Sequence, residues 1–311
     1  MLHRCICHTH QMRSQLMRLT HYQLIHSHSF SSSSIELHTQ QYPSIKSADP
    51  YKTPIVIIHG LLGSSNNWRG IATCAELSHN RHIYGVDVRN HGASPHTDTM
   101  RYDEMSNDII NVLDKYKLDQ CILIGHSLGG KIAMATALQN ESRIKSLIVV
   151  DMSPAKFKYT DDESWNSVGR IVDACANVDL DKCKSRDDCD QQLQQYNIND
   201  KSIRQFVLQN LVLNHATHKW NWRVNLNTIQ KSMMDIVNFD YNDPQQYTYN
   251  HPTLFIAGGN SNYIRKSHYE LIQQLFTQCE INTIEGAGHW VHIEKKNAFV
   301  KMVGDFLDKH E

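Results

Sequence analysis

Residues 120–136, QCILIGHSLGGKIAMAT, constrain the fold of this chain more than any other stretch. Residues 121–124 form a short apolar run with β-branched side chains, which predicts a buried strand. Residues 128–138 are small or straight-chain, which predicts a helix. Between them, residues 125–129 read G-x-S-x-G with Ser127 at the centre. The stretch therefore predicts a strand, a sharp turn that carries a serine, and a helix.

This arrangement is typical of a nucleophile elbow, in which the serine has a strained backbone at the tip of a strand. Gly125 and Gly129 lie two residues either side of Ser127, so the strand and the helix can approach without a clash of Cβ atoms. Chance produces the motif in roughly one chain in ten of this length. The alternative interpretation is a strand-to-helix turn that only happens to contain Ser127.

The composition narrows the classes of function. The chain has 311 residues, is 40% hydrophobic and has a formal net charge of −1. This suits one domain with an insertion and gives no electrostatic case for binding nucleic acid or an anionic membrane. No apolar run approaches the length of a transmembrane helix. The eight cysteines are scattered, which favours reduced thiols, and the spacing of Cys175, Cys183 and Cys189 matches no zinc motif. No metal and no cofactor are expected.

Residues 1–42 differ from the rest of the chain and are predicted to be a leader. They are serine-rich, and Arg4, Arg13 and Arg18 are the only strong charges before Glu36. Such basic, acid-poor composition is typical of an organelle transit peptide, so we expect import into the mitochondrial matrix. A disordered tail on a cytoplasmic protein is the alternative. Six of its histidines are interpreted as compositional bias rather than as a metal site: His3, His8, His10, His21, His26 and His28.

Strand and helix patterns alternate along residues 43–154 and again along residues 251–311, which predicts a mostly parallel sheet with helices on both faces. The alternation stops at Pro154. Residues 155–250 show helical periodicity and no convincing strand, which predicts an inserted helical cap too long for a simple connection. The expected order is strands at 55–58, 82–88, 121–124, 147–150, 253–257 and 279–284, and helices at 71–77, 102–116, 128–138, 269–276 and 298–307.

Polar residues follow several of the predicted strands, where ligands bind in open parallel sheets. Four such features lie at the ends of predicted strands: His59-Gly60, Ser127, Asp151 and His289. A serine needs a base to take its proton as it attacks, and histidine suits that role at neutral pH. We expect His289, in a Gly-Ala-Gly loop, to be this base. His292 is the competitor, although anchoring of the last helix suits it better.

The third member of such a triad is a carboxylate that holds the imidazole in the correct tautomer. It commonly lies in the loop that follows the insertion and its next strand, here residues 258–264, GGNSNYI. That loop offers Asn260 and Asn262 but no acid. We therefore predict Asp151, at the end of the strand expected beside the elbow strand. Asp235 and Asp243 in the insertion are the alternatives, and a cap for the following turn is the structural alternative for Asp151.

Acyl chemistry also needs hydrogen-bond donors for the oxyanion. The backbone amides of Leu128, after the serine, and of Leu61, in the HGLLG loop, are predicted to supply them. The leucines of that loop predict an apolar acyl pocket. Large apolar residues of the insertion could line the pocket or form the core of the cap: Trp165, Phe206, Leu208, Trp222 and Met233.

Six motifs together resemble the α/β-hydrolase superfamily: HGLLGSSNNW, VDVRNHGASPH, IGHSLGGKIAM, VVDMSP, LFIAGGNSNYI and GAGHWVHIEK. More narrowly, residues 52–310 are similar to the small bacterial esterases of the YbfF type and their mitochondrial eukaryotic relatives. The resemblance implies an eight-stranded sheet with a helical cap, and hydrolysis of esters by the serine. In the bacterial relatives the acid matches Asp151. Some eukaryotic relatives are assigned an aspartate where this chain has Asn227, so that assignment does not transfer.

The leading hypothesis is a serine esterase or lipase-like hydrolase that acts on short- to medium-chain acyl esters, including acylglycerols, through an acyl-Ser127 intermediate. Transfer of the same acyl group to an alcohol or thiol is the alternative. A binding protein that has lost the chemistry is a third hypothesis, disfavoured because both the serine and the histidine are present. The expected partner is a small-molecule or lipid ester, and no nucleic acid is expected.

Overall fold

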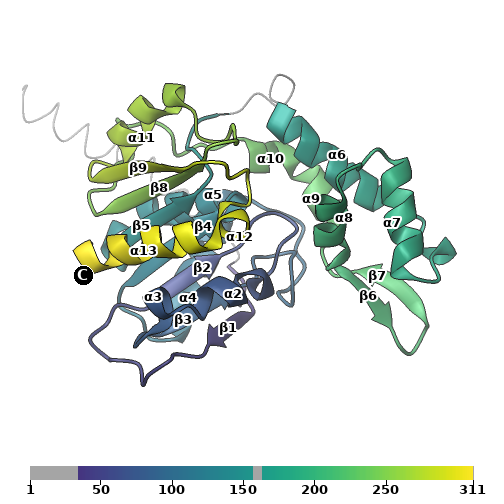
Figure 1. Ribbon diagram of the computed structural model, residues 1–311, viewed down its shortest axis with the longest axis horizontal. Helices are drawn as coiled ribbons and strands as arrows, with labels where there is room; N and C mark the ends of the chain where they lie inside the picture. The colour runs from purple at the N-terminus through teal and green to yellow at the C-terminus, as the bar shows by residue number, and fades with distance from the viewer. Residues whose placement is uncertain (1–33, 157–162, 311) are drawn as a thin grey trace, which may run out of the picture. The chain divides into compact units, whose positions relative to one another are not determined.

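A seven-stranded sheet organises the part of the chain that the computed structural model describes, residues 34–156 and 163–310 (Figure 1). Its strand order is β1-β3-β2-β4-β5-β8-β9. β1 pairs antiparallel to β3, and all other neighbours pair parallel. The strands are β1 (Thr39–Tyr42), β2 (Ile55–Ile58), β3 (Ile83–Val86), β4 (Cys121–His126), β5 (Ile144–Val150), β8 (Thr253–Gly258) and β9 (Cys279–Ile284).

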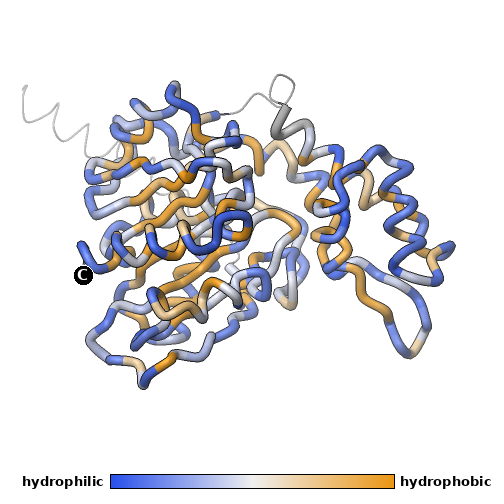
Figure 2. Tube along the Cα trace, in the orientation of Figure 1, coloured by the Kyte–Doolittle hydropathy of each residue, from blue (hydrophilic) through white to orange (hydrophobic). Residues whose placement is uncertain are grey.

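The central strands are apolar because helices cover both of their faces. Every residue of β2, β3, β4 and β8 is buried, and Figure 2 shows these strands as largely hydrophobic. One face of the sheet packs against α4 (Tyr102–Lys115), α5 (Leu128–Gln139) and α11 (Tyr269–Leu275). The other face packs against α2 (Arg69–Ala72), α3 (Ala75–Ser78), α12 (Val291–Glu294) and α13 (Lys296–His310). The predicted α/β-hydrolase architecture is therefore confirmed.

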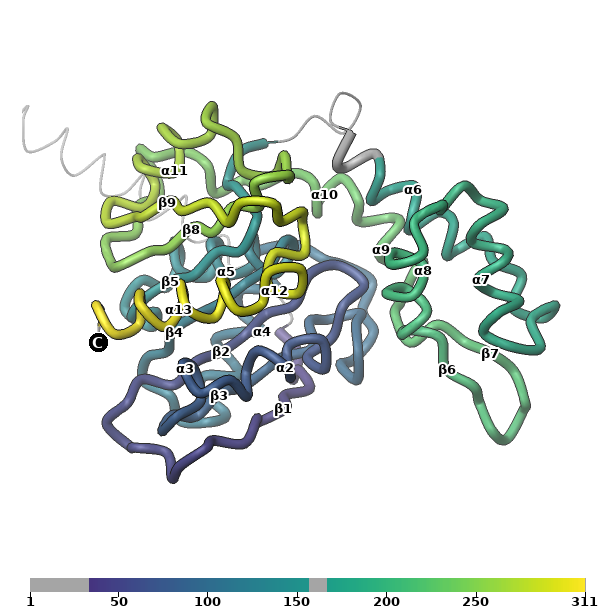
Figure 3. Tube along the Cα trace, viewed as in Figure 1, coloured from purple at the N-terminus to yellow at the C-terminus, as the bar shows by residue number. Residues whose placement is uncertain are grey.

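The cap leaves the sheet after β5 and returns before β8, as the colours of Figure 3 trace. Its elements are α6 (Glu163–Asn177), α7 (Arg186–Gln195), α8 (Lys201–Leu208), β6 (Leu211–Asn214), β7 (Lys219–Trp222), α9 (Leu226–Lys231) and α10 (Met233–Val237). Short 3-10 turns complete the chain at η1 (Ser65–Trp68), η2 (Glu141–Arg143), η3 (Leu180–Lys182) and η4 (Lys266–His268).

The expectation of a purely helical insertion was wrong. β6 and β7 form an antiparallel hairpin, and the helix before them, α8, ends at Leu208. There the side-chain amide of Asn210 donates to the carbonyl oxygen of Leu62 in the core, 2.7 Å away. The chain thus leaves the helix at Leu208, contacts the core through Asn210, and continues as strand β6 from Leu211.

Two further expectations need correction at the edge of the sheet. The resemblance implied eight strands, and seven are found among the described residues. β1 lies within the residues 1–42 that we assigned to a leader, and Leu37 is buried in the core. The folded part thus includes residues 34–42, because an antiparallel edge strand adds to β3 with backbone hydrogen bonds and needs little apolar sequence. The remaining leader, residues 1–33, lies outside the described residues, so its role stays a prediction.

Helix α5 packs tightly behind the elbow because it is largely apolar and is buried from Leu128 to Leu138. A Cβ atom on Gly129 would lie 2.3 Å from the carbonyl oxygen of Ile58 in β2. The buried amine of Lys131 donates to the carbonyl oxygen of Val237 at 2.6 Å, which ties α5 to the end of α10. Burial lowers the pKa of Lys131 to about 7. These contacts fix the helix whose first residue follows Ser127.

Candidate active site

Ser127 lies between β4 and α5 in a backbone conformation that non-glycine residues rarely adopt, with φ of 54° and ψ of −119°. Its amide donates to the carbonyl oxygen of Val150 in the neighbouring strand, 3.1 Å away. Its carbonyl oxygen accepts from the amide of Lys131 at 3.1 Å, in the first turn of α5. The strained residue is held from both sides, as the sequence motif predicts for an elbow.

His289 lies beside this serine, in the loop that follows β9. Its Nε2 is 3.0 Å from Ser127 Oγ, and its Nδ1 is 2.7 Å from Asp151 Oδ2. The ring stacks on Tyr263, with centroids 4.0 Å apart and planes at 27°. The His289 side chain is 22% exposed, whereas that of Asp151 is fully buried. The three predicted residues thus form one hydrogen-bonded series from a carboxylate to a hydroxyl.

Asp151 is held at the end of β5 by donors from the last residue of β8 and from the loop after it. Ser261 Oγ donates to Oδ2 at 2.5 Å, and the amide of Gly258 donates to Oδ1 at 3.0 Å. Residues 258–264, which contain no acid, therefore supply hydrogen-bond donors to Asp151 at the end of the neighbouring strand β5. Ser261 was not singled out from the sequence, because its role depends on how the loops after β5 and β8 meet.

The alternative assignments lie elsewhere. Asp235 is exposed on α10, and Asp243 Oδ1 accepts from the amide of Gln245. Asn227, on cap helix α9, is also exposed. His292, the competitor for the base, is buried and stacks on Trp68, with centroids 4.2 Å apart and planes at 2°. Burial lowers the pKa of His292, which belongs to α12, to about 3, so this ring stays neutral in the core. Among these candidates, only Asp151 and His289 are joined to Ser127.

Neutral histidines also brace the loops around the serine. His126, next to Ser127, is buried, and its Nε2–H donates to the carbonyl oxygen of His289 at 2.9 Å. Burial lowers the pKa of His126 well below its usual value. A neutral ring there can hold the His289 loop without placing a second positive charge beside the base.

The two predicted oxyanion donors belong to residues near the serine, since Leu128 follows Ser127 in the chain and Leu61 lines the same cavity as Ser127. Leu128 is the first residue of α5, where backbone amides have no intrahelical acceptor. Leu61 lies in the turn after β2, which is closed by a hydrogen bond from the amide of Gly63 to the carbonyl oxygen of Gly60 at 3.0 Å. The amide of the next residue, Leu62, is occupied because it donates to His91 Nε2 at 3.0 Å.

A cavity of about 1030 Å³ opens above Ser127 between the sheet and the cap. Its lining includes Ser127 and His289. The apolar part of its walls comes from Leu61, Ile171, Phe206 and Trp290. Of the large apolar residues that the sequence offered, Phe206 lines this cavity. Leu208 and Met233 are buried in the core of the structure, Trp222 is partly buried against it, and the side chain of Trp165 lies outside the described part.

The described residues also bear on cofactors and membranes. Within 34–156 and 163–310, no group of three or more histidine, cysteine, aspartate or glutamate side chains is arranged to hold a metal ion. No helix in this part of the chain is long and apolar enough to cross a membrane. The six cysteines described there are free thiols.

Comparison with known proteins gives matches over most of the chain. The mouse (Mus musculus) sn-1-specific diacylglycerol lipase ABHD11 is 38% identical over 258 residues, which cover 81% of this chain and 80% of that protein. Esterase YbfF of Escherichia coli (strain K12) is 31% identical, over 82% of this chain and 93% of that protein. A probable alcohol acetyltransferase of Saccharomyces cerevisiae is 28% identical, over 86% and 81%.

A solved structure of a marine microorganism esterase superposes with a TM-score of 0.79 at 32% identity, over 88% of this chain and 100% of that one. The family model described as alpha/beta hydrolase fold matches residues 53–296. The resemblance drawn from the six sequence motifs is thereby confirmed. The elbow, the parallel sheet and these matches together show that this chain belongs to the α/β-hydrolase fold family.

Proposed function

We propose that the protein is a serine carboxylic-ester hydrolase of the esterase/lipase type that works through an acyl-Ser127 intermediate. The observation that carries this proposal is the series Ser127 Oγ, His289 and Asp151, joined at 3.0 and 2.7 Å beside a large cavity. Relatives named as a lipase and an esterase support the same class of reaction.

In the proposed first half-reaction, His289 Nε2 takes the hydroxyl proton as Ser127 Oγ attacks the ester carbonyl. Asp151 keeps the proton on Nδ1 and stabilises the imidazolium that forms. The amides of Leu61 and Leu128 donate to the developing oxyanion. His289 then gives its proton to the leaving alcohol, which leaves the acyl group on Ser127, and water repeats these steps to release the acid.

The proposed substrates are short- to medium-chain acyl esters, including acylglycerols. A cavity of about 1030 Å³ with walls from Ile171, Phe206 and Trp290 supports an apolar acyl chain. The acylglycerol part of the proposal is further supported by the name of the mouse relative.

The test is hydrolysis of p-nitrophenyl esters from acetate to decanoate by the wild type and by Ser127→Ala. We expect near-complete loss in the variant, whereas Ser142→Ala should keep full activity because Ser142 is exposed at the opposite end of β5. Ester turnover that persists in Ser127→Ala would refute the proposal. Failure of a fluorophosphonate to label Ser127 in the folded wild type would favour a binding protein instead.

Acyl transfer is a second candidate because one relative is named a probable alcohol acetyltransferase. It uses the same acyl-Ser127, with an alcohol in place of water as the acceptor. Analysis of the products formed from acetyl-CoA in the presence of ethanol separates the two reactions. Ethyl acetate in excess over acetate would favour transfer, and acetate alone would favour hydrolysis.

The predicted mitochondrial location is tested with the full chain. We expect a fluorescent fusion of residues 1–311 to enter the matrix and a fusion that lacks residues 1–33 to remain in the cytoplasm. Identical distribution of the two fusions would refute the leader assignment.

A further inference from the structure

The loop that carries Leu61 is held in an unusual conformation by groups outside it. Leu62 has a φ of 59°, in the left-handed region that non-glycine residues rarely adopt. Such a conformation persists only where the surroundings enforce it. Because the amide of Leu61 is the proposed oxyanion donor, the groups that enforce the loop also determine where that donor points.

Both peptide planes that flank Leu61 are fixed by hydrogen bonds. The carbonyl oxygen of Gly60, in the same plane as the Leu61 amide, accepts from His59 Nδ1–H at 2.7 Å and from the amide of Gly63 at 3.0 Å. In a trans peptide the N–H points opposite to the carbonyl, so these bonds orient the Leu61 amide. The following plane is fixed because the Leu62 amide donates to His91 Nε2 at 3.0 Å.

His91 reaches this loop from the next strand in the sheet. It lies after β3 and is fully buried. Its Nδ1 faces the carbonyl oxygen of Arg89 at 3.0 Å and therefore carries the proton, which leaves Nε2 as the acceptor for the Leu62 amide. Burial lowers the pKa of His91 to about 3, so Nε2 stays unprotonated at neutral pH and can accept this hydrogen bond.

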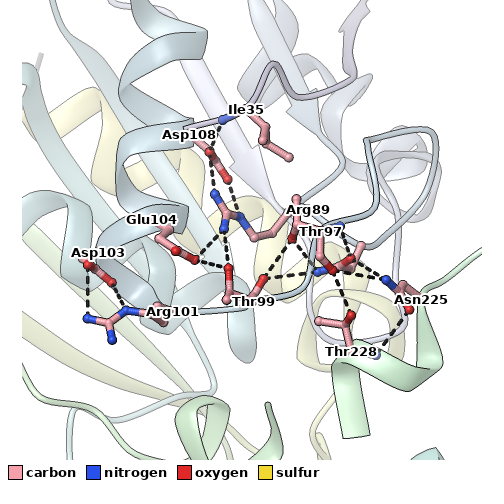
Figure 4. A network of polar contacts seen from close by, with 11 residues as sticks. Ile35, Arg89, Thr97, Thr99, Arg101, Asp103, Glu104, Asp108, Asn225 and Thr228 are labelled. Carbon is pink, nitrogen blue, oxygen red and sulfur yellow. Dashed lines mark hydrogen bonds and ion pairs between the residues drawn. The ribbon is translucent and has the colours of Figure 1, made fainter. Parts of the chain in front are cut away.

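The segment around His91 is anchored in turn. The guanidinium of Arg89 donates to Asp108 at 2.8 Å and to Glu104 at 2.6 Å, both on α4. Figure 4 shows this buried ion pair between the loop after β3 and that helix. On the cap side, the amide of Asn225 donates to the carbonyl oxygen of Asn90 at 2.9 Å. His91 thus projects from a rigid base onto the oxyanion loop.

We propose that His91 is a positioning residue for the oxyanion site, since its neutral ring holds the Leu62 amide and thereby keeps the Leu61 amide aimed at the reacting carbonyl. The proposal rests on the proposed ester hydrolysis. In the proposed role, His91 touches neither substrate nor Ser127 and acts only through the loop. Its loss should therefore weaken binding of the transition state while leaving binding of the ground-state ester largely unchanged.

Two amide variants are each expected to keep one of the two hydrogen bonds that the His91 ring makes. In His91→Gln the side-chain oxygen reaches the position of Nε2 and can accept from the Leu62 amide. In His91→Asn the shorter side chain can serve the carbonyl oxygen of Arg89 but does not reach Leu62. Both variants keep a buried polar amide, so they are matched in polarity. Tyr249→Phe serves as a control for stability, because it removes a buried hydrogen bond to the carbonyl oxygen of Ile144, remote from the site.

Removal of one oxyanion donor costs about 10²–10³ in kcat, and a displaced donor should cost less. We expect His91→Asn to lower kcat by roughly 10- to 100-fold with KM within about threefold of the wild type. His91→Gln should recover most of this loss. Inhibition constants for a trifluoromethyl ketone, whose adduct carries an oxyanion, should rise in proportion to the loss of kcat/KM. Tyr249→Phe should lower the melting temperature without changing kcat or the inhibition constant.

Equal kcat in His91→Asn and the wild type would overturn the positioning role and leave ester hydrolysis standing. So would a fall in kcat that is as large in His91→Gln as in His91→Asn, or an unchanged affinity for the ketone. If wild-type protein hydrolyses no ester, the proposed function and the positioning role fail together.

Discussion

Replacement of Asp151 by asparagine changes one atom of the proposed triad and is expected to remove most of its activity. The buried carboxylate accepts from three donors: His289 Nδ1–H and Ser261 Oγ–H at Oδ2, and the Gly258 amide at Oδ1. An asparagine offers one oxygen and one NH₂ group in the same space. In one orientation its NH₂ group faces His289 and forces the proton onto Nε2, so the ring cannot accept from Ser127. In the other orientation the NH₂ group faces the Gly258 amide.

The size of the effect follows from the role of the carboxylate. The neutral amide cannot stabilise an imidazolium, and such a substitution in a serine triad lowers kcat by about 10⁴, or roughly 5 kcal/mol in the barrier. KM should change little, because Asp151 does not line the cavity. The assay is the steady-state rate over the series of p-nitrophenyl esters, with Ser127→Ala as the background.

The control for this substitution is Asp235→Asn, which alters an exposed acid on the cap helix α10 and should leave the rate unchanged. Activity of Asp151→Asn within tenfold of the wild type would exclude Asp151 as the acid of the triad, since the carboxylate would then lie elsewhere. A loss in Asp235→Asn as large as that in Asp151→Asn would do the same.

Three further predictions concern stability. Gly129→Ala should give no soluble folded protein, because its Cβ would lie 2.3 Å from the Ile58 carbonyl oxygen. Gly70→Ala has open space around its Cβ and should fold, with a free energy of unfolding higher by up to about 1 kcal/mol. Expression and thermal melting check both variants. Asp108→Asn should lower the free energy of unfolding by about 1.5–3 kcal/mol in urea titrations, because it removes one charged hydrogen-bond partner of the buried guanidinium of Arg89, which keeps Glu104. A loss below about 0.5 kcal/mol would contradict the prediction. Acid should destabilise the fold from about pH 6.5 downward, because the unfolded chain then binds more protons than the folded one. The free energy of unfolding should fall by up to about 1.4 kcal/mol per pH unit for each buried histidine. A melting temperature that stays constant from about pH 7 to pH 5 would exclude this effect. Burial lowers the pKa of all four histidines in question: His59, His91, His126 and His292.

The order of elements could be predicted from the sequence because each signal was local. The apolar run of β4, the serine turn and the small residues of α5 are contiguous in the chain. The position of Asp151 followed from an absence, since residues 258–264 contain no acid. The structure brings that aspartate to His289 at 2.7 Å, although its catalytic role stays a proposal.

Other parts could not be predicted because their causes are not local. β1 has the sequence TQQY, which lacks an apolar strand pattern, and it forms by pairing with β3. α7 has only two buried residues, Cys189 and Leu193, so it shows little periodicity. Ser261 and His91 act across loops that meet only in the folded chain. A pattern in the sequence cannot report such meetings between distant segments.

The proposed mechanism requires Ser127 to carry the acyl group during turnover. The direct measurement is mass spectrometry of wild-type protein quenched in acid during hydrolysis of p-nitrophenyl butyrate, followed by peptide mapping. We expect a mass increase of one butyryl group on the peptide that contains Ser127, and no such increase in Ser127→Ala. Turnover without any adduct, or an adduct on a different residue, would contradict the proposed acyl-Ser127 intermediate.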